Sequence, residues 1–193
     1  MNITNRTSPK TTVSIIEGLT PRVAIKSEAL NKMYLFIKEC NEEVGWLGTI
    51  EQIENSQYFI INDVFLFEQN VSAVTTEITP EGLSTFAEEI MQRPDGMEVW
   101  NSMKVWGHSH VNMGITPSGQ DDKQMRDFQS GGHDYFIRLI GNKKGEMKLD
   151  FYNFKLGITY LDIPWERLES DEEVAISDEI FRLQQLLNQS ISG

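Results

Sequence analysis

The chain has few of the residues that mark secreted, membrane or nucleic-acid-binding proteins. It contains one cysteine, Cys40, so no internal disulfide can form, and this fits a reducing cytoplasm. Lysine and arginine number 17 against 29 aspartate and glutamate residues, and no basic stripe exists to displace counterions from phosphates. No apolar run is long enough to span a membrane, and residues 1–19 lack the apolar core of a signal peptide. We therefore predict a cytoplasmic protein that binds neither membrane nor nucleic acid.

At 193 residues the chain can bury one full core and carry appendages. We predict a polar lead-in over residues 1–19, a compact domain over 20–165 and an acidic amphipathic helix over 166–193. Apolar residues in the last segment recur at alternating spacings of four and three, at Ile176, Ile180, Leu183, Leu187 and Ile191. The simplest interpretation is a helix that packs on its own domain. The same spacing suits a short coiled coil, so homodimer formation or partner docking through 170–193 is the alternative.

Local patterns predict a mixture of helices and strands. Helices are expected over 27–41, from 80 onward and over 118–129. Strands are expected over 45–53, 57–67, 71–78, 103–110, 134–141 and 146–154. Residues 142–145 have the composition of a hairpin turn between the last two strands. The predicted fold class is α+β, with a mixed, mostly antiparallel sheet flanked by helices.

Histidine is also scarce, yet two of the three histidines stand close together, at His108 and His110. Successive side chains alternate along a strand, so both imidazoles project from one face and can reach one metal ion. Asp121 follows one helical turn after Ser118, a good N-cap, and can supply a third ligand. Two histidines and one carboxylate form the usual protein ligand set of a hydrolytic zinc site, which leaves one position open. We predict one zinc ion per chain.

A hydrolytic metal site needs a base to take a proton from water and return it. The candidate lies in the acidic pair Glu42 and Glu43, where the first predicted helix gives way to a strand. Either residue could be the base and the other a solvated residue at the helix end. Spacing alone does not choose between them.

These residues together resemble the motif of the JAMM (MPN-plus) zinc metalloproteases, E…H-[ST]-H-x7-S-x2-D. The resemblance implies an MPN domain of cytidine-deaminase-like fold and, by motif position, a role for each matching residue. Glu43 would be the general base and Ser118 would hydrogen-bond the developing oxyanion. His108, His110 and Asp121 would be the zinc ligands.

The resemblance also implies a substrate class. Members of the family cleave an isopeptide or peptide bond after the tail of ubiquitin or a ubiquitin-like protein, using a zinc-activated water. The single compact domain is similar to bacterial or phage members. Many members of the family carry proline after the second histidine, where this chain has Val111. We expect this difference to affect the path of the loop that follows, and with it substrate preference, more than zinc binding. The alternatives are a zinc peptidase acting on a cell-wall or phage-structural peptide and a non-catalytic MPN scaffold.

Overall fold

The computed structural model describes residues 20–54, 56–71, 76–77 and 79–169. The predicted lead-in and the amphipathic stripe beyond residue 169 lie outside the described residues. The helices are α2 (Ser27–Glu39), α3 (Pro80–Met91), α4 (Gly96–Asn101) and α5 (Gly119–Ser130). The strands are β1 (Arg22–Lys26), β2 (Gly45–Gln52), β3 (Tyr58–Phe65), β4 (Asn70–Val71), β5 (Thr76–Glu77), β6 (Met103–Ser109), β7 (Tyr135–Gly141), β8 (Met147–Asn153), β9 (Ile158–Tyr160) and β10 (Trp165–Leu168).

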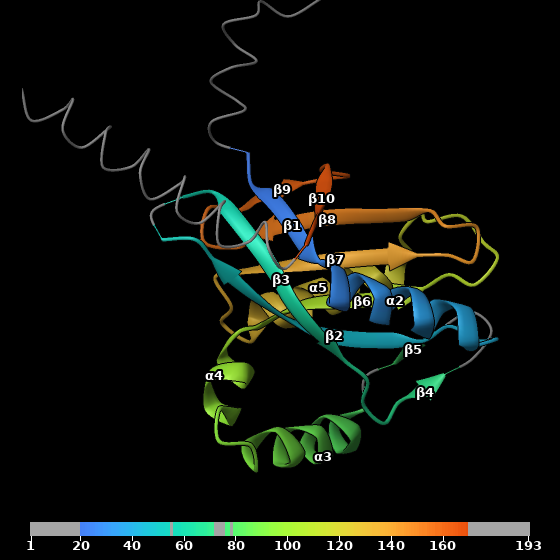
Figure 1. Ribbon diagram of the computed structural model, residues 1–193, viewed down its shortest axis with the longest axis horizontal. Coiled ribbons are helices and arrows are strands. Elements are labelled where there is room, and N and C mark those ends of the chain that lie inside the picture. The colour runs from blue at the N-terminus through green and yellow to red at the C-terminus, as the bar shows by residue number, and fades with distance from the viewer. Residues whose placement is uncertain (1–19, 55, 72–75, 78, 170–193) are drawn as a thin grey trace, which may run out of the picture.

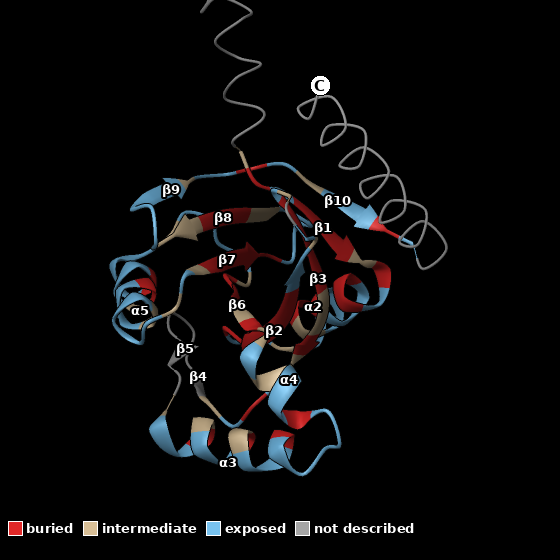
Figure 2. Ribbon diagram, turned by 90° about the vertical axis from the view of Figure 1, so that its left-hand side faces the viewer, coloured by how far each residue is buried: buried red, intermediate tan, exposed pale blue. Residues whose placement is uncertain are grey.

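One eight-stranded sheet dominates the described part of the chain, in the order β10-β1-β3-β2-β6-β7-β8-β9. Strand β1 runs parallel to both of its neighbours, β3 and β10, and β6 runs parallel to β7. The remaining neighbours in this sheet are antiparallel. The sheet curls, and both of its edge strands, β9 and β10, lie toward the top of the molecule (Figures 1 and 2).

The predicted fold class, an MPN-type α+β domain with a mostly antiparallel sheet flanked by helices, is therefore wrong. The structure is a curled, mixed half-barrel in which the sheet rather than the helices makes most of the fold. The error arises at strands β1, β9 and β10, which are too short to give a clear alternating pattern. Two of them create parallel pairs at the sheet edge that local sequence patterns do not reveal. Strand β10 also crosses the domain boundary predicted at residue 165.

Most of the other predicted elements are found within a few residues of their expected bounds. The strand expected over 71–78 is an exception, because the described residues there belong to two short strands, β4 and β5, that pair with each other rather than with the main sheet. Pro80 begins α3, and the side chain of Thr79 accepts a hydrogen bond from Gly82 N. The turn at 142–145 joins β7 to β8 as expected.

The core has two main parts, one on each face of the sheet. Helix α2 lies inside the curl and buries Met33 and Ile37 against residues of β1, β2, β3, β6, β7 and β8. On the other face, Phe86 of α3 and Met125 of α5 pack with Trp106 and Phe136 of the sheet. The central strands β6 and β7 are thus covered on both faces, and polar groups at their ends are held away from water (Figure 2).

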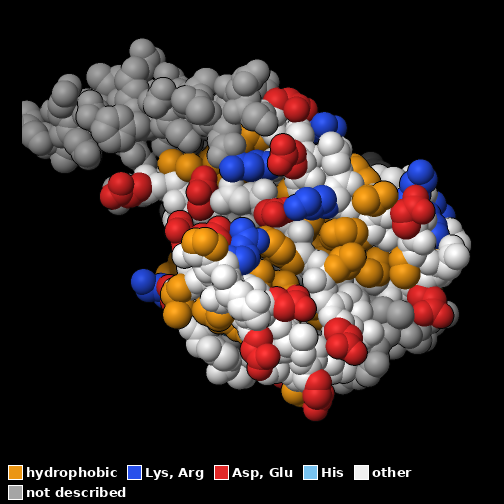
Figure 3. All heavy atoms as spheres, turned by 60° about the horizontal axis from the view of Figure 1, so that its bottom comes forward, with side chains coloured by type: hydrophobic (Ala, Val, Ile, Leu, Met, Phe, Trp, Pro, Cys, Tyr) orange, Lys and Arg blue, Asp and Glu red, His pale blue; other side chains and the backbone are white. Residues whose placement is uncertain are grey.

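The surface shows mixed charge. On the face shown in Figure 3, lysine and arginine side chains stand beside acidic ones, and apolar side chains lie between them. Exposed ion pairs such as Lys32 with Asp63 and Arg93 with Asp95 are examples of this mixing. In the described part of the chain, no helix is both long and apolar enough to cross a membrane.

Candidate metal centre

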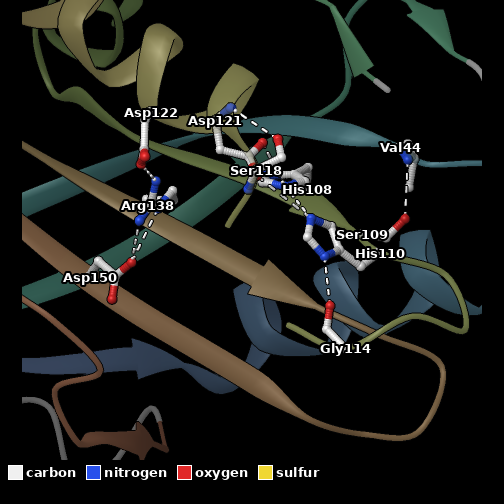
Figure 4. Close-up of polar contacts among 10 residues, drawn as sticks. All are labelled: Val44, His108, Ser109, His110, Gly114, Ser118, Asp121, Asp122, Arg138 and Asp150. Carbon is white, nitrogen blue, oxygen red and sulfur yellow. Dashed lines mark hydrogen bonds and ion pairs between the residues drawn. The ribbon is translucent and has the colours of Figure 1, made fainter. Parts of the chain in front are cut away.

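The two clustered histidines lie at the end of β6. The strand pairs with β2 on one side and β7 on the other, and His110 N donates to Gly141 O at 2.8 Å just beyond the last strand residue. Because side chains alternate, His108 and His110 point to the same face, toward the N-terminus of α5 (Figure 4). They are only 1% and 6% exposed, so both imidazoles are held in a fixed, largely dry position.

Helix α5 begins with a reciprocal cap that positions the carboxylate. Ser118 is the N-cap, and its hydroxyl oxygen accepts a hydrogen bond from Asp121 N at 3.3 Å. In return, Asp121 Oδ2 accepts from Ser118 N at 2.6 Å. This capping box satisfies two backbone N–H groups at the helix start and fixes the carboxylate of Asp121. Asp121 is buried, whereas Ser118 is exposed at the mouth of the site.

The three predicted ligands form one compact cluster. His108 Nε2 lies 3.0 Å from His110 Nε2 and 3.1 Å from Asp121 Oδ1, and His110 Nε2 lies 3.7 Å from Asp121 Oδ2 (Figure 4). With metal–ligand bonds of about 2.0–2.1 Å, neighbouring ligand atoms of a tetrahedral zinc site are about 3.3 Å apart. The three distances in the cluster spread around that value. This buried group could therefore hold a metal ion.

Hydrogen bonding sets the form of one imidazole. His110 Nδ1 lies 2.7 Å from Gly114 O, and a carbonyl can only accept, so His110 Nδ1 carries a proton. In a neutral ring, His110 Nε2 then presents a lone pair to the cluster. His108 Nε2 lies close to two acceptors, this lone pair and a carboxylate oxygen of Asp121. Three acceptor atoms this close together require a proton or a cation between them. His108 Nδ1 is buried with no hydrogen-bond partner among the described residues, and the ring stacks on Trp106 at 4.6 Å.

The charges of the cluster are unequal. Burial opposes ionisation of Asp121, but the adjacent imidazoles of His108 and His110 hold the pKa of this carboxyl well below its ordinary value. Burial lowers the pKa of His108. The adjacent carboxylate of Asp121 raises the pKa of His110, with burial opposing this shift. The site therefore contains a fixed carboxylate and at least one imidazole that stays neutral, which suits a metal cation.

The structure brings Glu43 to the same site. Gly45 of β2 pairs with His108, and the pairing continues beyond β2, where Ser109 N donates to Val44 O at 2.9 Å. One further step along this antiparallel register sets Glu43 opposite His110. Glu43 is 4% exposed, while its neighbour Glu42 is exposed. Burial raises the pKa of Glu43, His110 opposes this shift, and the charge of Asp121 adds to it.

Two side chains that the sequence did not single out fix the segment that carries Glu43. The hydroxyl oxygen of Ser109, between the two histidines, accepts from Val44 N at 3.1 Å. Gln69 acts as a substitute strand partner, because its Oε1 accepts from Gly45 N at 2.6 Å and its Nε2 donates to Gly45 O at 3.0 Å. The position of Ser109 between the two histidines of the motif could have indicated a structural role at the site. Gln69 sits in a loop and gives no sequence signal.

A buried network of charged side chains links the first turn of helix α5 to strands β7 and β8. Arg138 of β7 is 2% exposed and donates to Asp150 Oδ2 of β8 at 2.6 Å and 3.1 Å. It also donates to Asp122 Oδ1, one residue after the metal-site carboxylate, at 2.8 Å (Figure 4). The remaining oxygen of Asp150 accepts from Asp162 N at 2.8 Å. The network ties the first turn of α5 to the sheet.

Comparison with known proteins informs the fold alone. No family model matches the chain, and no curated protein matches it. Among solved structures, it is similar to the solution structure of protein DSY2949 from Desulfitobacterium hafniense, with a TM-score of 0.51 and 14% sequence identity. The match covers 77% of this chain and 92% of the other. At this identity the likeness is one of fold, so the JAMM resemblance stays a prediction from the sequence.

Proposed function

We propose that this protein is a zinc-dependent hydrolase that cleaves an amide bond, with Glu43 as its general base. The observation that carries the proposal is the buried carboxyl of Glu43 beside a buried group of two histidines and an aspartate. A carboxylate that only makes the surface polar would be exposed to water rather than buried beside metal-ligating side chains. Perturbed carboxyls beside a metal-ligand cluster are typical of hydrolytic sites.

His108, His110 and Asp121 would hold the zinc ion. When bound, zinc supplies a Lewis acid that lowers the pKa of water to about 7. Three protein ligands would leave one coordination position for this water, as is usual in hydrolytic zinc sites. Two nitrogens and one oxygen are a donor set that zinc accepts well, and the acidic ligand offsets part of its charge.

Glu43 would take the proton from the attacking water and deliver it to the leaving amine. Its raised pKa suits both tasks, because a carboxyl that is too acidic holds a proton poorly in the second step. Ser118 is exposed at the site while its hydroxyl oxygen accepts from Asp121 N. The hydroxyl hydrogen therefore remains available to donate to the oxyanion that develops on the substrate carbonyl.

For the substrate we propose a peptide or isopeptide bond that follows the tail of a ubiquitin-like protein. This rests on the motif formed by Glu43, His108, His110, Ser118 and Asp121. The single cysteine supports a cytoplasmic place of action.

The test is cleavage of a panel of isopeptide-linked ubiquitin dimers by the zinc-loaded protein, with two matched variants. Glu43→Gln keeps the size of the side chain and removes the base, so turnover should fall by about 10²–10⁴-fold with zinc content unchanged. Glu42→Gln makes the same chemical change one residue earlier, on an exposed side chain, and should behave like the native protein.

Near-native turnover by Glu43→Gln would refute its role as the base. A zinc-loaded native protein that cleaves no dimer, ubiquitin-like precursor or peptide would refute the proposed hydrolase and favour a non-catalytic role. Failure to bind zinc would refute the metal assignment itself.

A further inference from the structure

The turn between β7 and β8 contains an asparagine that is buried although it sits at a hairpin tip. Asn142 is 2% exposed. Its Oδ1 accepts from Lys144 N at 3.0 Å and from Glu146 N at 3.1 Å. Because both partners are donors, these bonds identify which end of the amide is the oxygen, and the Nδ2 group must face the other way.

The Nδ2 group connects the hairpin to the metal centre. One of its hydrogens is donated to the carboxylate of Glu146, within the turn. The other is donated to Met113 O at 2.9 Å. Met113 belongs to the irregular segment between His110 and helix α5. Of the four side-chain bonds of Asn142, this is the one that leaves the hairpin.

The segment that Asn142 reaches carries the carbonyl that orients His110. Gly114 directly follows Met113, and Gly114 O is the acceptor for His110 Nδ1 at 2.7 Å. The segment begins in an unfavourable conformation, since Val111 has φ of 45°, where a β-branched residue is rarely found. Lys143 N also donates to Val111 O, at 2.7 Å. Hydrogen bonds from the hairpin thus stabilise a backbone conformation of this segment that is unfavourable in isolation.

We propose that Asn142 is a positioning residue for the metal centre, acting through Met113 and Gly114 on His110. Its amide fixes the place of the Met113 carbonyl and therefore of the next peptide unit. This places Gly114 O where it accepts the proton of His110 Nδ1. His110 Nε2 is then left with its lone pair facing His108 and Asp121. The proposal rests on the metal site of the proposed function and deepens it, but it concerns the orientation and tautomer of the His110 ring, which can be measured without zinc and without hydrolysis.

The first variant is Asn142→Ser. A serine oxygen can still accept from Lys144 N, as in common Ser-turns, but it is too short to reach Met113 O. It adds no charge. The matched control is Glu146→Gln, which alters the other Nδ2 contact and leaves the bond to Met113 in place. Glu146 is exposed, so water can replace its lost partner.

Two readouts separate positioning from simple support of the turn. Zinc affinity, measured by competition with a chelator, should fall by about 10–100-fold in Asn142→Ser relative to Glu146→Gln. In the metal-free proteins, the ¹⁵N shifts of the His110 ring should show the Nδ1–H form in the native protein and in the control, and a mixture of forms in Asn142→Ser. Circular dichroism and thermal unfolding report whether the sheet is intact.

If Asn142→Ser does not fold, the double variant Asn142→Asp/Glu146→Gln decides the matter. The aspartate still accepts the two backbone N–H groups, and the glutamine can donate to it, so the turn keeps its bonds while Met113 O faces an acceptor. Zinc affinity within twofold of Glu146→Gln, with an unchanged His110 ring, would overturn the role of Asn142. A native protein that binds no zinc would refute the proposed function instead, and the His110 ring signals would still decide the role of Asn142.

Discussion

Asp150→Asn should be among the most destabilising single changes in this protein, although Asp150 lies outside the metal-ligand set. The carboxylate is 1% exposed and pairs with Arg138, which is 2% exposed. Asparagine keeps an oxygen for Asp162 N, but it replaces the charged oxygen that accepts from Arg138 with an NH2 group, which cannot accept. The guanidinium of Arg138 is then left buried with one carboxylate partner, Asp122.

Breaking a buried ion pair by removing one member costs about 3–5 kcal/mol of unfolding free energy. For a chain of this size each kcal/mol lowers the melting temperature by about 2–4 °C, so Asp150→Asn should melt about 6–20 °C below the native protein. Asp122→Asn is the matched control. It removes the other carboxylate of the same arginine, but that side chain is 55% exposed, so the expected cost is about 1 kcal/mol or less.

The assay is urea unfolding of the metal-free proteins, followed by tryptophan fluorescence, with calorimetry for the melting temperatures. A double-mutant cycle with Arg138→Met completes the set. Removing both charges should cost less than the sum of the two single changes, because no unpaired charge remains buried. Equal midpoints for Asp150→Asn and Asp122→Asn would refute the argument that burial decides the cost.

Two further predictions concern the metal centre and the strand that carries it. Zinc affinity should fall as the pH drops below the raised pKa of His110, by up to about tenfold per pH unit, because a protonated imidazole cannot ligate; an affinity that stays flat between pH 7 and pH 5 in a chelator-competition titration would contradict this. Gly107→Ala should lower the unfolding free energy by about 1–3 kcal/mol, because the new methyl group would stand 2.1 Å from Nε1 of the buried Trp46. Gly119→Ala, which meets nothing within 4 Å, serves as the urea-unfolding control, and an equal loss in both would disprove the packing argument.

The parts of the site that follow from local rules could be predicted from the sequence. Alternation along a strand puts His108 and His110 on one face, and the cap at Ser118 turns Asp121 in the same direction. For Glu43 the residue pattern left two adjacent candidates. The structure separates them by burial, which depends on the register of β2 against β6.

What could not be predicted depends on segments that are distant in the chain. Strand β1 has five residues and is completed by β10, about 140 residues later, so neither strand shows its partner locally. The bonds of Gln69 to Gly45 and of Asn142 to Met113 form where separate loops meet at the candidate metal centre. The fold class was predicted wrongly for the same reason, because parallel pairing leaves no short-range pattern.

The place of β1 has a consequence for how the chain folds during synthesis. Strand β1 is made early, yet one of its two edges receives its partner only when Trp165–Leu168 has been made. Until then the parallel edge carries unpaired N–H and C=O groups, which form a template for pairing with another chain. A chain shortened before Trp165 would keep that edge open permanently, and we expect it to aggregate even though every residue of the candidate metal centre is present.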